Sequence, residues 1–320
     1  MVSSDFVIGV DLGGTKIYTA LANKEGEILA EVKILTEAND GPEHVIRRIV
    51  ETVNEVLKLS GFSGQPGCLG IGAPGPLDPR RGFVYQAPNL GWRDVPLKQL
   101  LEEALHMPVV VGNDANLAAL GEHVFGAFRG VDDMIYVTVS TGIGGGLILG
   151  GKLYLGAGFG AGEIGHMTVE PDGPVCSCGN RGCLEALASG TAMAKRARQL
   201  VEAGSGRGIF MLAGGAMENI TARVVSRAAA GGDEEALGIL AGAGRALGIG
   251  LACVINLLNP SLVLLGGGAM QAGRPLWQAM TEELNKRAIR STLQQVQVIP
   301  ATLGPRSGLL GAVALAIGKG

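Results

Sequence analysis

Three of the five cysteines lie close together in residues 176–185, CSCGNRGCLE. Cys176 and Cys178 are one residue apart and cannot readily pair with each other, whereas thiolates at C-x-C-x4-C spacing can converge on one zinc ion. The nearest candidate for a fourth ligand is His166, which precedes a Pro/Gly turn; its alternative interpretation is an ordinary polar or core histidine. A closed Cys3His site is structural, because a catalytic zinc keeps one position open for water. We therefore predict a structural Zn²⁺ bound by His166, Cys176, Cys178 and Cys183.

The two other cysteines stand alone in apolar runs. Cys68 begins CLGIGAP, and Cys253 lies within LACVINLL. Both are predicted to be buried core thiols without chemistry. The odd cysteine count also argues against a disulfide framework.

Glycine-rich turns interrupt strand-like runs at two places. Residues 6–29 and residues 134–156 each read as strand, glycine turn, strand, turn and strand, with the first turns at Gly13–Gly14 and Gly142–Gly146. Helix-patterned segments follow both, at residues 42–61 and 189–204. The simplest architecture with this pattern is a pair of similar α/β halves.

The residues beside these turns favour phosphate binding over a purely structural turn, which remains the alternative. Backbone N–H groups of a turn without Cβ atoms can point at an anion, and hydroxyl groups add donors. A carboxylate at Asp11 would repel bare phosphate, so its place here requires a divalent cation or a water shell between them. The predicted phosphate site comprises Asp11, Gly13, Gly14, Thr15, Lys16, Ser140, Thr141, Gly142, Gly144 and Gly145.

Two other nucleotide motifs are excluded. GIGAPG at residues 70–75 matches G-x-G-x-x-G, but Pro74, Pro76 and Pro79 forbid the helix that would hold a pyrophosphate. GLILGGKL at residues 146–153 resembles a Walker A loop, yet Leu153 stands where Ser or Thr must hold magnesium.

The chain resembles the ROK family of sugar kinases from Val7 to about Gly311, and within it the bacterial glucokinases. The resemblance rests on GVDLGGTK, GAPGPLD, VGNDANLAALGE, TVSTGIGGGLI, GAGEIGHM, CSCGNRGCLE and LVLLGGG, in that order. It implies the duplicated actin-like (ribonuclease H-like) α/β fold, with ATP and sugar in an interdomain cleft. We expect a small lobe at 1–117 completed by a C-terminal helix at 305–320, and a large lobe with the zinc loop at 118–304. Some family members are repressors with an added helix-turn-helix; because the first strand starts at Phe6, we expect none before it.

The resemblance further implies ATP-dependent, magnesium-requiring phosphorylation of a hexose at its 6-hydroxyl, with glucose expected first. Kinases of N-acetylglucosamine, N-acetylmannosamine, mannose or fructose remain alternatives, because the sequence does not show the room left at C2. A non-catalytic sugar-sensing protein is the remote alternative. The family commonly forms homodimers or homotetramers.

Asp114 is the predicted catalytic base. The apolar run PVVV predicts a buried strand that delivers Asn113 and Asp114 to its end, and the family places its catalytic aspartate at the matching position. Phosphoryl transfer to a hydroxyl needs a carboxylate that takes the proton. The alternative is that these two residues only cap the following helix.

The resemblance also implies which residues bind the sugar and the adenosine. Glu163 and Glu185 flank the zinc loop, so the metal would hold both carboxylates against the same sugar. Family members bind adenosine near the turn that follows the buried strand SLVLL; a plain connection is the alternative. The implied sugar ligands are Gly75, Asn89, Asn113, Asp114, Glu163, His166 and Glu185, and the implied adenosine turn is Gly266, Gly267 and Gly268.

Composition narrows the class of protein. The 320 residues are 47% hydrophobic, and 26 Lys+Arg against 29 Asp+Glu leave a net charge of -3 with no basic run. Neither nucleic acid nor a membrane surface is therefore expected as a partner. The N-terminus lacks a signal-peptide pattern, and the longest apolar run is too short to span a bilayer, so we expect a cytoplasmic protein.

Overall fold

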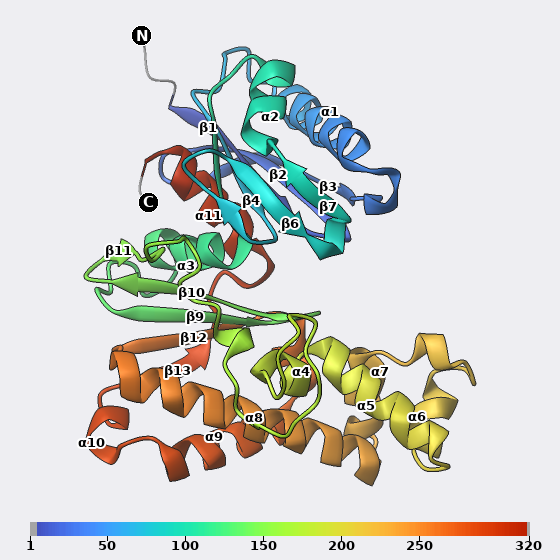
Figure 1. The fold of residues 1–320 in the computed structure, drawn as a ribbon. Coiled ribbons are helices and arrows are strands. Elements are labelled where there is room, and N and C mark those ends of the chain that lie inside the picture. The colour runs from blue at the N-terminus through green and yellow to red at the C-terminus, as the bar shows by residue number, and fades with distance from the viewer. Residues whose placement is uncertain (1–4, 319–320) are drawn as a thin grey trace. The chain divides into compact units, whose positions relative to one another are not determined.

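The computed structural model describes residues 5–318, and two five-stranded sheets with equivalent strand orders organise them (Figure 1). The first sheet has the order β3-β2-β1-β4-β8, and the second has the order β11-β10-β9-β12-β13. Each sheet starts from three consecutive strands joined by short turns, and two later strands extend it: β4 and β8 in parallel to β1 in the first sheet, and β12 with β13 parallel to it in the second. The duplication predicted from the glycine turns is confirmed. The strands are β1 Phe6–Leu12, β2 Lys16–Asn23, β3 Ile28–Leu35, β4 Leu69–Ala73, β8 Val109–Asn113, β9 Met134–Val139, β10 Ile143–Leu149, β11 Lys152–Leu153, β12 Leu262–Gly266 and β13 Gln297–Pro300.

The chain divides into two compact units. Among the described residues, the first unit comprises 5–136, 146–162 and 301–318, and the second comprises 137–145 and 163–300. A small three-stranded sheet, β5-β6-β7, belongs to the first unit. Its strands are β5 Leu77–Asp78, β6 Phe83–Ala87 and β7 Trp92–Val95. The lobe limits expected from the sequence stay a prediction.

Helices cover both faces of the first sheet (Figure 1). On one face lie α1 Pro42–Ser60 and α2 Leu97–Leu105; on the other lie α3 Asp114–Phe125 and α11 Ser307–Ala316. The α1 helix begins with a proline at its first position and ends at Gly61 in the left-handed conformation, as local sequence rules predict. It buries Val45, Ile49 and Val53, which recur at helical spacing and therefore share one face.

The helices α3 and α11 cross with their backbones almost in contact. An ideal Cβ atom on Gly311 would lie 1.6 Å from the carbonyl oxygen of Leu117, and one on Gly121 would lie 2.3 Å from that of Ser307. No side chain fits at either position, so glycine is required there by the approach of the two helices.

A fully buried carboxylate, Glu122, holds the same two helices together. Its oxygens accept hydrogen bonds from the Thr302 hydroxyl at 2.6 Å, the Leu303 N–H at 2.8 Å and the Ser307 hydroxyl at 2.8 Å. The Thr302 N–H adds a fourth at 3.1 Å. Glu122 thus fixes the segment in front of α11 onto α3, and the burial of its oxygen atoms is tolerated because both accept hydrogen bonds.

The second unit contains most of the remaining helices. The longest, α8, starts after Asp233, whose side chain accepts the N–H of Ala236 at 2.8 Å. By length and composition α8 could cross a membrane, but 67% of its apolar window is buried within the protein, as expected for a core helix. The helices are α4 Leu184–Ala188, α5 Gly190–Glu202, α6 Arg207–Leu212, α7 Ala222–Ala230, α8 Glu234–Leu258, α9 Arg274–Arg287 and α10 Arg290–Leu293.

Two local predictions were wrong. The second glycine turn was expected at 142–146, but it is formed by residues 140–142, and Gly144 and Gly145 lie within β10. The next glycine, Gly146, is required because α3 passes close by: an ideal Cβ there would lie 2.6 Å from that of Ala119.

The second wrong prediction concerns the isolated cysteines. Cys253 was expected in the core but is exposed, because it lies on the outer side of α8 between the buried residues Ala252 and Val254. Cys68 is half-buried, and desolvation by burial raises the pKa of its thiol.

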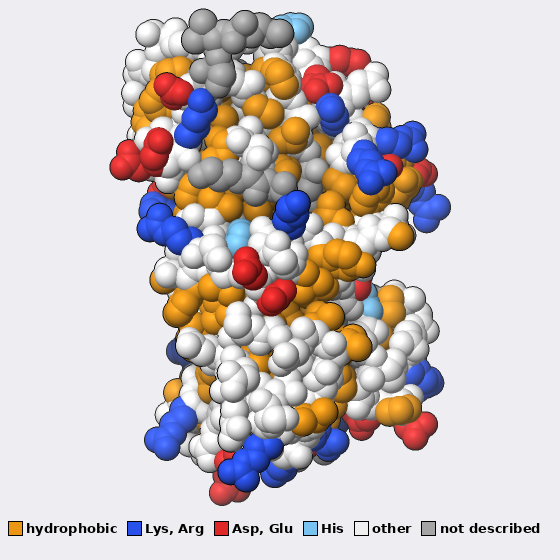
Figure 2. Space-filling model, turned by 90° about the vertical axis from the view of Figure 1, so that its left-hand side faces the viewer, with side chains coloured by type: hydrophobic (Ala, Val, Ile, Leu, Met, Phe, Trp, Pro, Cys, Tyr) orange, Lys and Arg blue, Asp and Glu red, His pale blue; other side chains and the backbone are white. Residues whose placement is uncertain are grey.

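Charged side chains are interspersed on the surface. On the face drawn in Figure 2, lysines and arginines stand among acidic and uncharged groups, without a continuous basic patch among the described residues. This distribution agrees with the net charge of -3.

We predict that Glu122→Ala destabilises the fold. The change removes the acceptor of the Thr302 and Leu303 N–H groups and of the buried Ser307 hydroxyl, which should lower the free energy of unfolding by about 3 kcal/mol in urea denaturation. The exposed Glu55 in α1 provides the control, and Glu55→Ala should change it by less than about 0.5 kcal/mol. Equal effects of the two variants would contradict the role given to Glu122.

Candidate functional site

The first glycine turn, residues 13–15, is held by the end of β3. The Thr36 hydroxyl donates to the Gly13 carbonyl at 2.6 Å, and the Thr36 N–H donates to the Thr15 carbonyl at 2.9 Å. Thr15 and Lys16 are exposed. An ideal Cβ on Gly14 would lie 2.6 Å from the carbonyl oxygen of Asn89, so this predicted phosphate turn lies against a predicted sugar residue.

Asp11 lies near the end of β1 in the first unit and is largely shielded from solvent. Burial raises the pKa of its carboxyl from 3.8 to about 6, and Lys33 offsets this only in part. The N-terminal turn of α11 lies beside it, since an ideal Cβ on Gly308 would be 3.0 Å from the Asp11 carboxyl carbon. A carboxylate in this position suits a bound divalent cation, whose charge would offset the lost hydration.

Asn113 and Asp114 occupy the junction of β8 and α3. Asn113 is the N-cap of α3, and its side-chain oxygen accepts the N–H groups of Ala115 and Asn116 at 3.0 and 3.2 Å. Its amide nitrogen also donates to the Gly75 carbonyl at 3.4 Å. Asp114 occupies the first helical position, where the helix dipole favours an ionised carboxylate. The structure thus gives the capping role to Asn113 and brings Asn113, Asp114 and Gly75 together.

The second glycine turn, residues 140–142, rests on the start of α5. The Ser140 carbonyl accepts the N–H of Gly190 at 2.7 Å, and the Thr141 carbonyl accepts the Thr191 hydroxyl at 2.8 Å. Both hydroxyl residues of the turn, Ser140 and Thr141, are exposed. The adenosine candidate is a near neighbour, since Gly267 has φ 88° and its ideal Cβ would lie 2.2 Å from the Val139 carbonyl oxygen.

Glu185 connects this turn to the cysteine loop. One carboxylate oxygen accepts the Ile143 N–H at 2.9 Å, and the other accepts the Ser177 hydroxyl at 3.4 Å. An ideal Cβ on Gly142 would lie 2.4 Å from a Glu185 oxygen, so the turn and the carboxylate are in contact. Glu185 therefore lies between the predicted phosphate turn and the predicted zinc ligands.

The four predicted zinc ligands converge. The ligand atoms of His166, Cys176, Cys178 and Cys183 all lie within 4.8 Å of one another. Cys178 Sγ and Cys183 Sγ are 3.7 Å apart, which is too long for a disulfide but close to the ~3.8 Å separation of two thiolates on a tetrahedral zinc. Cys176 Sγ lies 3.7 Å from His166 Nδ1. The donor types and their spacing fit Zn²⁺.

The thiols of this cluster differ in acidity. Hydrogen bonding from the Asn180 N–H lowers the pKa of Cys178, while burial and the neighbouring thiols raise that of Cys183 to about 12. Because the thiol of Cys183 is such a weak acid, the three neighbouring sulfurs need a bound cation if all of them are to be thiolates.

Glu163 stands at the start of the short helix that leads to the zinc ligand His166. It is exposed, and its carbonyl accepts the His166 N–H at 3.0 Å. This short helix packs on the beginning of β10, because an ideal Cβ on Gly165 would lie 2.1 Å from the Ile143 carbonyl oxygen. Glu163, His166 and Glu185 thus share one neighbourhood in the second unit.

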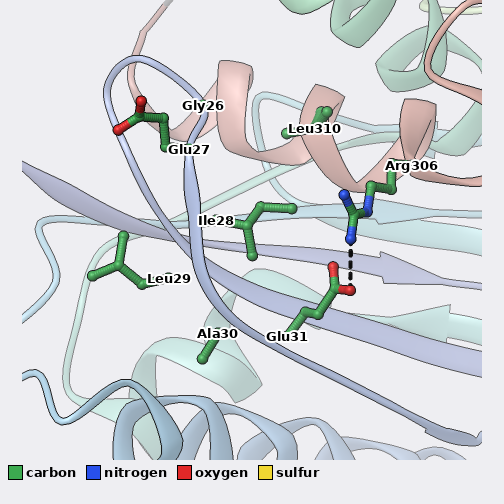
Figure 3. A pocket seen from close by; sticks show the side chains of 8 residues that line it. All are labelled: Gly26, Glu27, Ile28, Leu29, Ala30, Glu31, Arg306 and Leu310. Atoms are coloured by element: carbon green, nitrogen blue, oxygen red, sulfur yellow. Dashed lines mark hydrogen bonds and ion pairs between the residues drawn. The ribbon is translucent and has the colours of Figure 1, made fainter.

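A cavity of about 580 Å³ in the first unit contains none of these residues (Figure 3). The ion pair between Arg306 and Glu31, at 2.8 Å, crosses its wall, and Tyr18 donates a hydrogen bond to the same carboxylate at 2.7 Å. These polar groups satisfy one another, so we assign no ligand to the cavity. It is lined by residues 26–31 together with Arg306 and Leu310.

Sequence reasoning missed three supporting residues. Thr36 and Glu122 hold the first glycine turn and the α3–α11 pair, and neither had a sequence signal, because their partners depend on the fold. Ser189 is the buried N-cap of α5, behind the second turn. Its position in front of a helical pattern was a usable signal.

Comparison with known proteins places the chain in a family. The ROK family model matches residues 7–319. The chain is 40% identical over 311 residues to a glucokinase of Thermotoga maritima (97% of this chain, 96% of that protein), and 36% identical to a putative xylose repressor of Caldicellulosiruptor (97% and 78%). The crystal structure of a ROK family glucokinase from Streptomyces griseus, in complex with glucose and AMPPNP, matches with a TM-score of 0.84 at 38% identity (97% and 99%).

The raised pKa of Asp11 predicts a pH-dependent cost to stability. Between pH 4 and 6 the folded chain retains a proton that the unfolded chain releases, so the stability falls as the pH rises and the full cost is present above pH 6. In magnesium-free buffer, the free energy of unfolding of Asp11→Asn should be about 2 to 3 kcal/mol higher than that of the wild type at pH 8. At pH 4 the two values should be nearly equal. Denaturant titrations at both pH values test this, with the exposed Asp172→Asn as control. A gain that is the same at both pH values would refute it.

Proposed function

We propose that this chain, which belongs to the ROK family, is an ATP-dependent hexokinase that phosphorylates glucose at its 6-hydroxyl. The observation that carries the proposal is the match, along almost the whole chain, to a glucokinase whose crystal structure contains glucose and an ATP analogue. Fold and family agree with the actin-like architecture expected from the duplicated sheets.

Asp114 is the proposed base. Its carboxylate would accept the proton of the attacking hydroxyl as the new O–P bond forms and the bond between the γ-phosphate and ADP breaks. Its place in the first turn of α3, directly after β8 and the N-cap Asn113, supports this role, because the end of a buried strand fixes where the carboxylate lies.

The two glycine turns are the proposed phosphate contacts. Thr15, Lys16, Ser140 and Thr141 are exposed on them and can donate to phosphate oxygens. Asp11 fits a magnesium ion, and bound Mg²⁺ would neutralise charge on the phosphates. The Gly266–Gly268 turn, close to the second phosphate turn, is the proposed contact for adenosine.

The proposed hexose ligands are Gly75, Asn89, Asn113, Asp114, Glu163, His166 and Glu185. Carboxylate and amide groups match the donors and acceptors of sugar hydroxyls, and leaving one of them unpaired is costly. The hydrogen bonds that the Glu185 carboxylate accepts from the Ile143 N–H and the Ser177 hydroxyl hold this side chain in a fixed position.

The cysteine cluster is a proposed structural zinc site. Bound Zn²⁺ would hold the three thiolates and His166 as one unit. The loop would then keep Glu163 and Glu185 in place for the sugar, since both lie in or next to segments that carry zinc ligands.

We also propose a cytoplasmic homodimer or homotetramer. Leu257 is 81% exposed at the end of α8, and Ile289, 57% exposed, is tied to the neighbouring Asn256 by a 2.8 Å hydrogen bond. Two such apolar side chains on one surface support an interface between subunits.

The first prediction of this proposal concerns substrate and base. With ATP and magnesium the protein should phosphorylate glucose faster than N-acetylglucosamine, N-acetylmannosamine, mannose, fructose or xylose. Asp114→Asn should lose more than 95% of kcat while glucose binding stays within about tenfold, because the base acts mainly in the transition state.

No turnover of any sugar in the panel would favour the non-catalytic sugar-sensing alternative that the repressor relatives keep open. A variant at Asp114 that retained substantial kcat would show that another group is the base.

A second prediction concerns the metal. Metal analysis should find one zinc per chain, present with or without nucleotide, and Cys178→Ser should release it, because a neutral hydroxyl is a far poorer ligand than a thiolate. The KM for hexose should then rise sharply while the KM for ATP stays nearly unchanged. Cys253→Ser, at an exposed cysteine outside the cluster, should keep both the zinc and the KM. A wild type without zinc, or a zinc-free Cys178→Ser with a normal hexose KM, would refute the role.

A further inference from the structure

The loop in front of Glu163 has an unusual conformation. It closes on itself, because the Ala161 N–H donates to the Leu155 carbonyl at 3.0 Å and the Phe159 N–H donates to that of Gly156 at 3.4 Å. At its tip Phe159 has φ 62°, in the left-handed region that bulky side chains rarely adopt. Such a conformation persists only where surrounding contacts hold it.

Two contacts hold Phe159. The guanidinium carbon of Arg80 lies 5.1 Å from the centre of its ring, within range of a cation–π interaction. Phe159 also lines a cavity of about 40 Å³ together with Leu155 of the same loop and with Asn113 and Leu117. Phe159 is therefore a neighbour both of Arg80 and of the junction where α3 begins.

Arg80 belongs to a part of the fold that carries other proposed sugar contacts. It follows β5, where the Asp78 side chain accepts its N–H at 2.9 Å and so fixes the turn. The small sheet β5-β6-β7 is flanked by Gly75 in front of β5 and contains the β6–β7 connection with Asn89. On the other side of the stack, Gly162 alone separates the closed loop from Glu163.

We propose that Arg80 and Phe159 are positioning residues of the hexose site. Their stack fixes the loop that leads to Glu163 onto the small sheet that presents Gly75 and Asn89. Neither side chain is assigned a contact with substrate. The inference rests on the proposed hexokinase function and adds to it two residues that set hexose affinity.

The chain contains a matched control for this interaction. The next residue, Arg81, lies over the ring of Phe83 at 5.2 Å, and its N–H donates to the same Asp78 side chain at 3.1 Å. Both members of that second stack belong to the small sheet or its turn, so losing it removes a similar contact without freeing the loop.

Steady-state kinetics on four single variants and one double variant test the proposal. Arg80→Gln and Phe159→Leu should each raise the KM for glucose at least fivefold, with kcat and the KM for ATP changed less than twofold. Phe159→Tyr, which keeps the aromatic ring, and Arg81→Gln should stay within twofold of wild type. Combining Arg80→Gln with Phe159→Leu should add little to either alone, because both remove the same contact.

Hydrogen exchange of peptides from residues 155–163, without any ligand, provides a readout that does not need activity. Exchange should be at least fivefold faster in Arg80→Gln and unchanged in Arg81→Gln. If glucose is turned over but Arg80→Gln and Arg81→Gln are alike in KM and exchange, this inference is overturned and the proposed function stands. If the wild type turns over no hexose, the proposed function falls, and the exchange comparison still decides whether the stack holds the loop.

Discussion

The hydrogen bonds of the buried Glu122 carboxylate are the constraint on which the first unit depends. They join α3 to the segment in front of α11, and the two helices then pack with glycine at their crossing. One helix begins with Asp114, and the first turn of the other borders Asp11. Glu122, which has no direct role in the proposed chemistry, therefore helps to set the positions of Asp114 and Asp11, which do have one.

The second unit solves a comparable problem with less regular structure. Its proposed ligands lie on short helices and turns, which cannot fix side chains by themselves. The Glu185 carboxylate bridges the second glycine turn and the cysteine loop, and the converging sulfurs close that loop. Local order in this unit thus comes from cross-links between loops, and a metal at the cysteines would supply the strongest of them.

The duplicated glycine turns show how one motif is supported in two ways. The first turn depends on Thr36, at the end of a strand, whereas the second depends on the N-terminal N–H groups of α5. In both cases, the carbonyl groups of the turn are bonded to the protein, which leaves the exposed hydroxyls facing solvent. Burial of the Asp11 carboxyl, which raises its pKa, and the left-handed backbone of Phe159 both lower the stability of the fold. Functional sites commonly retain such unfavourable features.

The sequence by itself determined the features that depend on local spacing: the repeated strand and turn pattern, the helices at residues 42–60 and 190–202, and the cysteine loop with His166. Only the tertiary structure decided features that depend on distant partners. Glu122 meets Leu303, 181 residues away, Gly146 is required by a passing helix, and Cys253 faces outward because its neighbours on α8 occupy the core. The candidate site is divided in the same way. Residue types and motifs indicate its ligands, whereas the contacts that hold them, such as Thr36 on Gly13, arise from packing that no short stretch of sequence encodes.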